Sequence, residues 1–210
     1  MAPQKLIESS LSQFAAQLAE RTPTPGGGSM AAYLAASGAA LVAMACRFTS
    51  GDKFAAVQAA ATATADALDE LRPAALGLVD RDARAYDAVT AALAMPKSTD
   101  AEKQARSAAM QQALRGALEV PFETLVLAVR GLELAAPLAP GVNPNLASDC
   151  GVGARCLQGA AEGAFLNVRI NARSIKDAEY AKARLAEAER LRDRARELGD
   201  RVVRAIESLS

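Results

Sequence analysis

Apolar residues recur every three or four positions along most of the chain, which is the spacing of one face of an α-helix. The first series predicts a surface helix with one buried stripe, ending at Thr22 and Pro23. Its apolar members are Ile7, Leu11, Phe14 and Leu18. From Met30 to Phe48 the residues are apolar on nearly all sides, so this segment is expected to be a helix surrounded by others.

Glycines and prolines divide the following stretch into separate predicted helices. Ser50 and Gly51 end the central helix, and a helix from Lys53 to about Leu71 is expected to end or kink at Pro73. A further helix is predicted from Ala74 to Met95, closed by Pro96.

A long helical segment is predicted from Asp100 to about Ala136. Thr99 and Glu102 have the spacing of a capping box at its start, and Pro121 is expected to bend it. The stretch PLAPGVNPNLASD, residues 137–149, holds three prolines and is expected to be a loop.

Two more helices are predicted in the last third of the chain. Ser148 or Asp149 is expected to cap a helix that reaches about Asn171, and Ser174 with Asp177 to cap the last one. The last helix alternates apolar residues at helical spacing with Arg and Glu. Its charged side is either a solvated face or a seam for a partner helix.

The composition agrees with an all-α fold, because alanine dominates and aromatic residues make up only 4% of the chain. We therefore predict a bundle of six to eight helices that forms one domain over residues 1–210. Lys+Arg and Asp+Glu both number 24, which lacks the basic excess of a nucleic-acid-binding protein.

Further features bear on the compartment. The three cysteines show no CxxC pairing, which indicates neither a disulfide framework nor a zinc site and favours a reducing cytoplasm. No signal peptide is recognised at the N-terminus. The uncharged run from Met30 to Cys46 is shorter than a membrane span and rich in alanine, so we expect a buried helix and no membrane partner.

The chain contains no histidine, so any proton transfer must use another group such as Asp, Glu, Lys, Tyr, Cys or water. This excludes Ser-His-Asp and Cys-His nucleophile systems. We expect neither a metal nor a redox cofactor, because the sequence carries no motif for one.

The stretch TPTPGGGSM, residues 22–30, places Gly26, Gly27, Gly28 and Ser29 at the start of the most apolar helix. Glycines allow a ligand to approach the backbone closely, and the amides at a helix start favour an anion. The same residues could instead form a tight turn between closely packed helices. The lysine of a phosphate-binding P-loop is missing.

Carboxylates are the other candidates for chemistry. Asp82 and Tyr86 lie four residues apart on one helix face, and an inward Asp82 would have a raised pKa suited to a general base or acid. Alternatively, the acids of this segment are surface groups paired with Arg81 and Arg84. The polar residues of the later loop could bind a ligand or serve only as turn and cap residues; they are Asn143, Asn145, Ser148 and Asp149.

Taken in order, four stretches resemble the cyclodeaminase/cyclohydrolase family, the C-terminal domain type of formiminotransferase-cyclodeaminase. They are TPTPGGGSMAAYLAASGAALVAMACRFTSGDKF, DRDARAYDAVTAALAMPK, EVPFETL and NPNLASDCGVGARCLQGAAEGAFLNVRIN. The resemblance covers roughly Ser9 to Ser174. It implies an all-helical homodimer that acts on the one-carbon bridge between N5 and N10 of a tetrahydrofolate.

The resemblance also implies roles for particular residues. Asp82 matches the acidic position of the family's DxDAxA(F/Y) stretch and is expected to be catalytic, with Asp149 of the SD pair as the second candidate. Gly26, Gly27, Gly28 and Ser29 would line the folate site. Further substrate contacts are expected from Lys53, Tyr86, Asn143 and Ser148, although Asp52 stands where relatives carry a second basic residue beside Lys53.

Two folate reactions and one non-catalytic role fit these features. The chain has no formiminotransferase domain, which favours hydrolysis of 5,10-methenyltetrahydrofolate to 10-formyltetrahydrofolate. A cyclodeaminase would instead release ammonia from 5-formiminotetrahydrofolate. A helical scaffold whose charged last helix binds a partner explains the C-terminus but leaves PGGGS and NPNLASD as mere turns.

Overall fold

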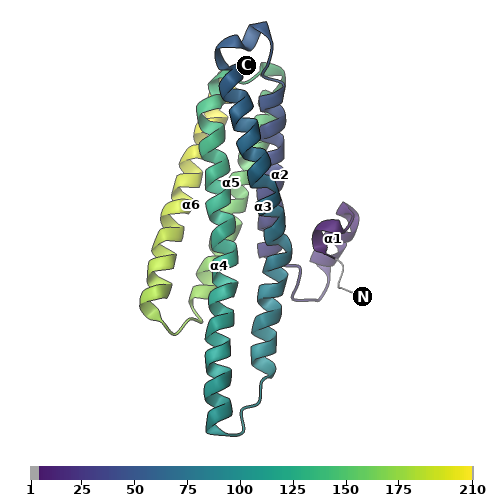
Figure 1. Cartoon of the computed structure of the whole chain (residues 1–210). Coiled ribbons are helices and arrows are strands. Elements are labelled where there is room, and N and C mark those ends of the chain that lie inside the picture. The colour runs from purple at the N-terminus through teal and green to yellow at the C-terminus, as the bar shows by residue number, and fades with distance from the viewer. Residues whose placement is uncertain (1–4, 210) are drawn as a thin grey trace.

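The structure, a computed structural model, describes residues 5–209 as a bundle of long helices with no strand in that range (Figure 1). The expected all-α fold of six to eight helices is confirmed. Residues 1–4, which belong to the N-terminus where no signal peptide is expected, lie outside the described residues. The α-helices are α1 (Leu11–Ala19), α2 (Gly27–Arg47), α3 (Ala55–Ala94), α4 (Asp100–Leu138), α5 (Ala147–Ala172) and α6 (Ala178–Glu207).

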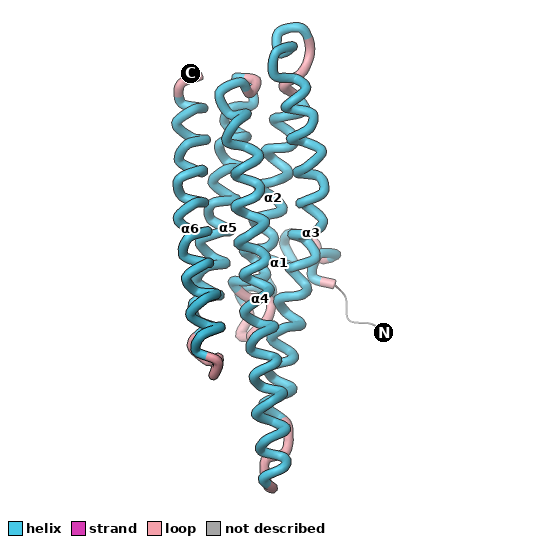
Figure 2. Tube along the Cα trace, turned by 60° about the vertical axis from the view of Figure 1, so that its left-hand side comes forward, coloured by secondary structure: helices cyan, strands magenta, loops and turns pink. Residues whose placement is uncertain are grey.

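Four helices form the centre of the bundle. α2 contacts α3 and α5, and α4 packs between α3 and α5 on the other side, while α6 covers α4 and α5. The helices run side by side along one axis, and α3 and α4 extend beyond the others as a hairpin (Figures 1 and 2). This hairpin leaves part of both helices uncovered below the starts of α2 and α6.

Small residues let α2 lie close to α5. A Cβ atom on Gly38 would stand 2.7 Å from the carbonyl oxygen of Gly153, and one on Gly153 would stand 2.9 Å from that of Gly38. The two backbones therefore touch, which only glycine allows at this crossing. The expectation that α2 is surrounded by other helices is confirmed by its many buried alanines.

The expectation of two helices on either side of Pro73 is wrong, since α3 runs through it without a break. Proline removes one amide and its ring crowds the preceding turn, but Pro73 lies on the exposed side of α3. Leu68, Leu71 and Ala75 are buried around it. Packing of this apolar face on both sides of the proline holds the helix together, which local propensity does not reveal.

Helix starts were predicted well in two places and poorly in a third. The capping box at Thr99 and Glu102 is present, and the Asp177 side chain accepts a hydrogen bond from the Tyr180 amide at the start of α6. Ser148 and Asp149 do not cap α5. A 3₁₀ turn over Pro144–Leu146 leads directly into α5, so both residues already lie in its first turn.

The N-terminal segment differs most from its sequence pattern. Ile7 lies in a short 3₁₀ turn and is 41% exposed, and Leu11 is 70% exposed. Only Phe14 of α1 is buried, with its ring 5.7 Å from that of Tyr33 on α2. Leu18 is partly buried and packs against the same cluster, so the predicted apolar stripe on α1 is reduced to Phe14 and Leu18.

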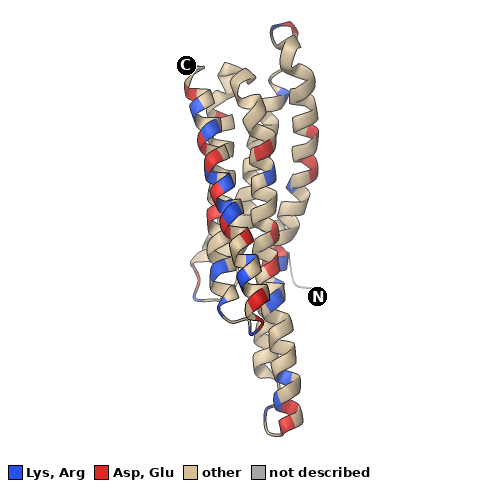
Figure 3. Cartoon of the chain, turned by 90° about the vertical axis from the view of Figure 1, so that its left-hand side faces the viewer, with Lys and Arg blue, Asp and Glu red and all other residues tan. Residues whose placement is uncertain are grey.

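Charges on α6 gather away from the bundle, where Arg and Glu alternate along its length (Figure 3). Its opposite face supplies buried residues to the core: Ala188, Ala195, Leu198, Gly199, Val202 and Ile206. Ion pairs join α6 to α5, among them Arg155 with Asp200 at 2.6 Å and Arg196 with Glu162. Asp200 and Arg196 of α6 are thus used at the edge of its contact with α5.

Candidate active site

The start of α2 and the middle of α3 bring two of the predicted features into direct contact. A Cβ atom on Gly28 would stand 2.1 Å from Oδ1 and 2.6 Å from Cγ of Asp82. Any side chain larger than hydrogen would therefore displace this carboxylate. The glycine run and Asp82 are 54 or more residues apart in sequence, and the fold makes them one site.

Ser29 connects the same carboxylate to the backbone of α3. Its buried hydroxyl lies 2.9 Å from Oδ2 of Asp82 and 3.0 Å from the carbonyl oxygen of Val79. One hydroxyl proton is shared between two acceptors while Asp82 is ionised. When Asp82 is protonated on Oδ2 it can donate to Ser29, and Ser29 can then donate fully to Val79.

Burial raises the pKa of the Asp82 carboxyl, and the hydroxyl and backbone amide of Ser29 oppose part of that shift. The neighbouring Arg81 does not neutralise it, because Arg81 forms a two-pronged ion pair with Glu123 at 2.5 and 2.8 Å. The alternative of a surface acid paired with arginine therefore does not hold for Asp82. A carboxylate held in this way is a stronger base than an exposed aspartate.

The glycines expose the main chain beside this acid. Gly26 is the N-cap residue of α2, and Gly27 and Gly28 form its first turn, whose amides have no partner within the helix. The partial positive charge of the helix start faces the same region. The site thus combines an anionic side chain with amide donors that can bind polar edges of a ligand.

Asn167 of α5 is a site residue that sequence reasoning did not single out. A Cβ atom on Gly27 would lie 3.6 Å from its Nδ2 atom, which donates to the Gly163 carbonyl oxygen at 2.9 Å. Asn167 lies in the NVRIN end of the last matching stretch, but a single asparagine among the other polar residues of α5 carries no local signature of ligand binding. Asp82 and Asn167 therefore approach the start of α2 from two helices.

Tyr86 lies one turn beyond Asp82 on α3 and is 45% exposed. This position extends the site along the uncovered part of the α3–α4 hairpin. Asp80, two residues before Asp82, has a structural role instead, since its Oδ1 accepts a hydrogen bond of 2.6 Å from the Leu6 amide.

The remaining predicted residues gather at the opposite end of α2. The Asn143 side-chain amide donates to the Phe48 carbonyl oxygen at 2.8 Å. The backbone amide of Asn143 donates to Thr49 Oγ1 at 3.0 Å. Lys53 is exposed just after α2, and Ser148 and Asp149 lie in the first turn of α5. About 20 residues of α2 separate this end from Gly28, or about 30 Å. Within one chain they do not share a site with Asp82.

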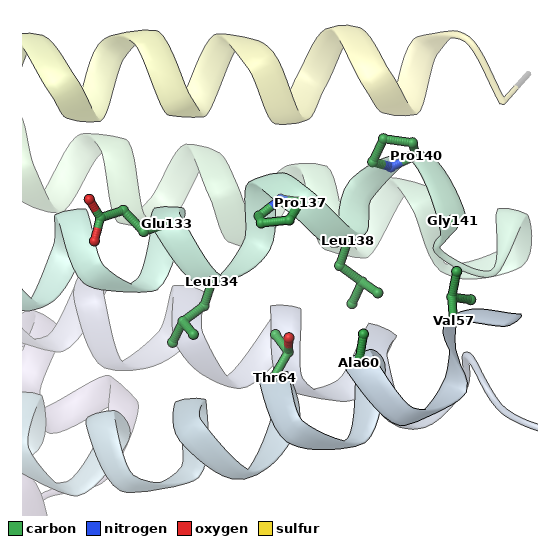
Figure 4. Close-up of a pocket in the computed structure, with 9 residues that line it drawn as sticks. All are labelled: Val57, Ala60, Thr64, Glu133, Leu134, Pro137, Leu138, Pro140 and Gly141. Atoms are coloured by element: carbon green, nitrogen blue, oxygen red, sulfur yellow. The ribbon is translucent and has the colours of Figure 1, made fainter.

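An apolar pocket of about 480 Å³ lies between α3 and α4 near that same end (Figure 4). Val57, Leu134 and Leu138 supply its walls, and Glu133 is its only ionisable lining residue. The Glu133 carboxylate is directed away from Ala60 and Thr64 in Figure 4. The lining of this pocket has few groups that could bind a polar ligand or transfer a proton. The contact of Gly28 with Asp82 is therefore the stronger candidate for the active site.

By length and composition, α2 could cross a membrane, with a mean hydropathy of 1.6 over its most apolar window. In the bundle 61% of that window is buried against other helices. The apolar character of α2 is thus explained by its central position.

The fold and site together define a class: an all-helical bundle protein with a half-buried carboxylate at a glycine-rich helix start. The chain belongs to the formiminotransferase-cyclodeaminase family, whose family model matches residues 10–190. This confirms the resemblance seen in the four ordered stretches.

Individual relatives give the same picture. The chain is 38% identical over 192 residues to a methenyltetrahydrofolate cyclohydrolase of Methylorubrum extorquens, covering 91% of this chain and 92% of that protein. It is 36% identical over 177 residues to the formimidoyltransferase-cyclodeaminase of Gallus gallus, covering 83% of this chain but only 32% of that longer protein.

A solved structure has the same fold. The formiminotetrahydrofolate cyclodeaminase of Thermotoga maritima superimposes with a TM-score of 0.86 and 28% identity. The match covers 97% of this chain and 98% of that one. The arrangement of helices around α2 is therefore shared with a protein of similar length.

Proposed function

We propose that this chain is a methenyltetrahydrofolate cyclohydrolase, which hydrolyses 5,10-methenyltetrahydrofolate to 10-formyltetrahydrofolate. The observation that carries the proposal is the Asp82 carboxylate, half-buried, bound by Ser29 and pressed against Gly28. The expected function agrees with that of the Methylorubrum relative, which matches over nearly the full length of both chains.

The chemistry of the substrate suits such a group. The methenyl bridge is a cationic amidinium, and an anionic carboxylate in a partly buried site stabilises that cation. Water adds to the bridge carbon, a C–O bond forms, and Asp82 accepts the proton of the water. The C–N5 bond then breaks while Asp82 returns this proton to N5, the new hydroxyl group releases its own proton to solvent water, and the formyl group remains on N10.

Ser29 assists by holding both protonation states of Asp82. It donates to the carboxylate before water attacks, and it accepts from the protonated acid while donating to Val79 afterwards. Gly27 and Gly28 leave room for the folate against the main chain, and Asn167 offers an amide beside them. No histidine is needed for any of these steps.

Cyclodeamination of 5-formiminotetrahydrofolate is the second candidate, favoured by the match to the Thermotoga cyclodeaminase. Asp82 would then protonate the departing ammonia instead of accepting a proton from water. The two activities are separated by assaying loss of methenyltetrahydrofolate absorbance and release of ammonia with the same purified protein.

A homodimer is part of the proposal, and the outer face of α2 and α5 supports it. Leu34 lies over Gly159, where a Cβ atom would be 3.2 Å from its Cδ2, so partly buried positions of both helices adjoin at this face. This apolar face comprises Leu34, Leu41, Met44, Phe48, Val152, Leu166 and Ile170, of which the last two are 52% and 54% exposed. The charged residues Arg155 and Glu162 of α5 are paired with α6 instead.

A second copy would cover this face by a two-fold axis. With the axis across the middle of α2, the partner's α2 runs antiparallel to the first. The end that carries Asn143, Lys53 and Asp149 then approaches the Asp82 end of the other subunit. This arrangement would unite the two groups of residues that lie about 30 Å apart in one chain.

Subunit mixing tests this arrangement. Asp82→Asn and Asn143→Ala are each expected to be nearly inactive. A refolded one-to-one mixture should recover about a quarter of wild-type activity, because half of the dimers are mixed and each has one intact site. Leu166→Glu with Ile170→Glu should give monomers by sedimentation velocity, with Val126→Glu on exposed α4 surface as the control. No recovery on mixing would refute the shared site.

The cytoplasm is the proposed location. All three cysteines are free thiols in the described part of the chain, and burial raises the pKa of Cys46 to about 12 and of Cys150 to about 11. Such thiols agree with a reducing compartment.

The function itself is tested by following the ultraviolet absorbance of methenyltetrahydrofolate. Wild-type protein should accelerate its loss above the spontaneous rate, and Asp82→Asn should reduce kcat by about 10²- to 10⁴-fold, the range for loss of a general base. An Asp82→Asn variant with full activity would exclude this carboxylate from the chemistry.

A further inference from the structure

The stretch EVPFETL, residues 119–125 of α4, is the one matching stretch that the proposed mechanism does not use. Its two acids, Glu119 and Glu123, lie one helical turn apart on the same side of α4. Glu119 pairs with Arg184 of α6 at 2.8 Å, and Glu123 pairs with Arg81 of α3. All four residues line one cavity of about 560 Å³ between these helices. EVPFETL therefore supplies the anions for both arginines of this cavity.

Arg81 directly precedes Asp82 on α3, so the Cα atoms of the two residues are about 3.8 Å apart. Consecutive side chains of a helix point about 100° apart. The Asp82 carboxylate lies on the α2 side of α3, against Gly28. Arg81 turns to α4, where its Nη1 and Nη2 atoms donate to the Glu123 carboxylate at 2.5 and 2.8 Å. The ion pair thus holds a guanidinium next to the catalytic carboxylate on a different side of the helix.

The other acids around Arg81 have partners of their own. Glu119 accepts hydrogen bonds from Arg184 and from the Tyr180 hydroxyl. Asp80 is buried, and its Oδ1 accepts a hydrogen bond from the Leu6 amide. Without Glu123, the charge of Arg81 would be left uncompensated beside Asp82.

The elements packed around Asp82 supply few other charges. α2 carries no charged side chain between Gly27 and Cys46. In the N-terminal segment, Lys5 pairs with Glu8 at 3.7 Å. On α3 itself, Arg84 is exposed to solvent. Arg81 is therefore the neighbouring cation of Asp82 whose position is set by an ion pair.

An uncompensated guanidinium would oppose the proposed reaction in two ways. It would repel the amidinium cation of the substrate, which weakens substrate binding. It would also favour the ionised form of Asp82, which counteracts the effect of burial on the pKa of this carboxyl and makes it a weaker base.

We infer that Glu123 is a positioning residue of the proposed active site, which holds Arg81 on α4 and so keeps its charge away from Asp82 and the cationic substrate. Glu123 acts through Arg81 and touches neither the substrate nor Asp82 in this role. The inference rests on the proposed cyclohydrolase function and gives the EVPFETL stretch a part in it.

The same ion pair also joins α3 to α4, so a purely structural link is the competing explanation. A structural link is lost equally when either partner is replaced. The inferred role is lost only when the acid is removed and the arginine stays. The two explanations therefore give different results for the Arg81 variant.

Steady-state kinetics with 5,10-methenyltetrahydrofolate separate them. Glu123→Gln should raise KM about three- to tenfold, and this effect should shrink as salt is raised, because exposed charges are screened over about 10 Å at 0.1 M salt. Arg81→Gln should show a KM no higher than wild type, and the double variant Arg81→Gln, Glu123→Gln should return to the wild-type KM. Equal KM increases in the two single variants, or a double variant no better than Glu123→Gln, would overturn the inference.

Two controls accompany these variants. Asp200→Asn removes the anion paired with Arg155 at 2.6 Å between α5 and α6, and it should leave KM unchanged. The product 10-formyltetrahydrofolate lacks the amidinium cation, so its inhibition constant should be the same in Glu123→Gln and in wild type. An equal weakening of product and substrate binding would show a general distortion of the site and overturn the inference.

Titration of Asp82 by ¹³C NMR tests the inference without any folate. The carboxyl signal of Asp82 is assigned by its absence in Asp82→Asn. Glu123→Gln should lower the pKa of Asp82 below its wild-type value, and the added Arg81→Gln replacement should restore it. An unchanged pKa in Glu123→Gln would overturn the inference even if the folate is turned over. A lowered pKa in a protein that does not turn over methenyltetrahydrofolate would support the control of Asp82 by Glu123 and refute only the proposed reaction.

Discussion

Replacement of Gly28 by alanine tests the central contact of the site. The added Cβ atom would stand 2.1 Å from Oδ1 and 2.6 Å from Cγ of Asp82. Carbon and oxygen atoms that are not bonded need roughly 3.4 Å, so the carboxylate must retreat by more than about 1 Å. The movement would also strain the hydrogen bond of 2.9 Å between Ser29 and Oδ2.

Activity should fall far more than stability in Gly28→Ala. A displacement of about 1 Å in a reacting group costs about 10²-fold in rate, and we expect a loss of this size in kcat for methenyltetrahydrofolate. Crowding costs about 1–3 kcal/mol in the free energy of unfolding, and the better helix propensity of alanine offsets up to about 1 kcal/mol. The expected net change is therefore a loss of about 0–3 kcal/mol.

Gly116→Ala is the matched control, because a Cβ atom there meets no other atom within 4 Å. It should keep full activity and gain up to about 1 kcal/mol of stability from helix propensity. Both variants are compared by absorbance assay and by urea unfolding. A folded Gly28→Ala protein with wild-type kcat would refute the view that this glycine exists to admit the Asp82 carboxylate.

Four further experiments have defined outcomes. Because burial raises the pKa of Asp82 in the folded state, ionisation of this carboxyl costs folding stability as pH rises through that pKa. Calorimetry should therefore show that Asp82→Asn melts no lower than wild type at pH 7–8. Any higher melting temperature of the variant should disappear in acid, where Asp82 of the wild type is protonated. In wild type, kcat/KM should rise with pH through a pKa above 3.8 and then level off, because Asp82 must be ionised to accept the proton. A rise of kcat/KM centred at or below pH 3.8 would contradict the role of Asp82 as general base. Gly38→Ala should lose about 1–3 kcal/mol in urea unfolding, because its Cβ would stand 2.7 Å from the Gly153 carbonyl oxygen, and an unchanged midpoint would contradict the close helix crossing. Asn143→Ala should lose about 1–2 kcal/mol through its bond to the Phe48 carbonyl oxygen, measured in the same way.

The helices were largely predictable because their signals are local. The capping box at Thr99 and the cap at Asp177 act within one turn, so the sequence places those helix starts correctly. Pro73 shows the limit of this reasoning. Its local preference opposes a continuous helix, and only the burial of Leu68 and Leu71 on the same face outweighs it.

The candidate site was predicted in part. The sequence pointed to the glycine run and to Asp82 as separate features, each with a plain structural alternative. It did not reveal Asn167, because an isolated asparagine on a helix carries no local signature of ligand binding. It also grouped Asn143 and Asp149 with Asp82, which the single chain keeps at opposite ends of α2.

The sequence by itself determined an all-helical chain, the burial of α2 and the family to which the ordered stretches belong, since periodicity and motif order are properties of the chain. Only the tertiary structure decided that Asp82 faces Gly28 and that Arg81 pairs with Glu123. Helical periodicity fixes which residues share a face, but contacts between residues more than 50 positions apart depend on how those faces pack.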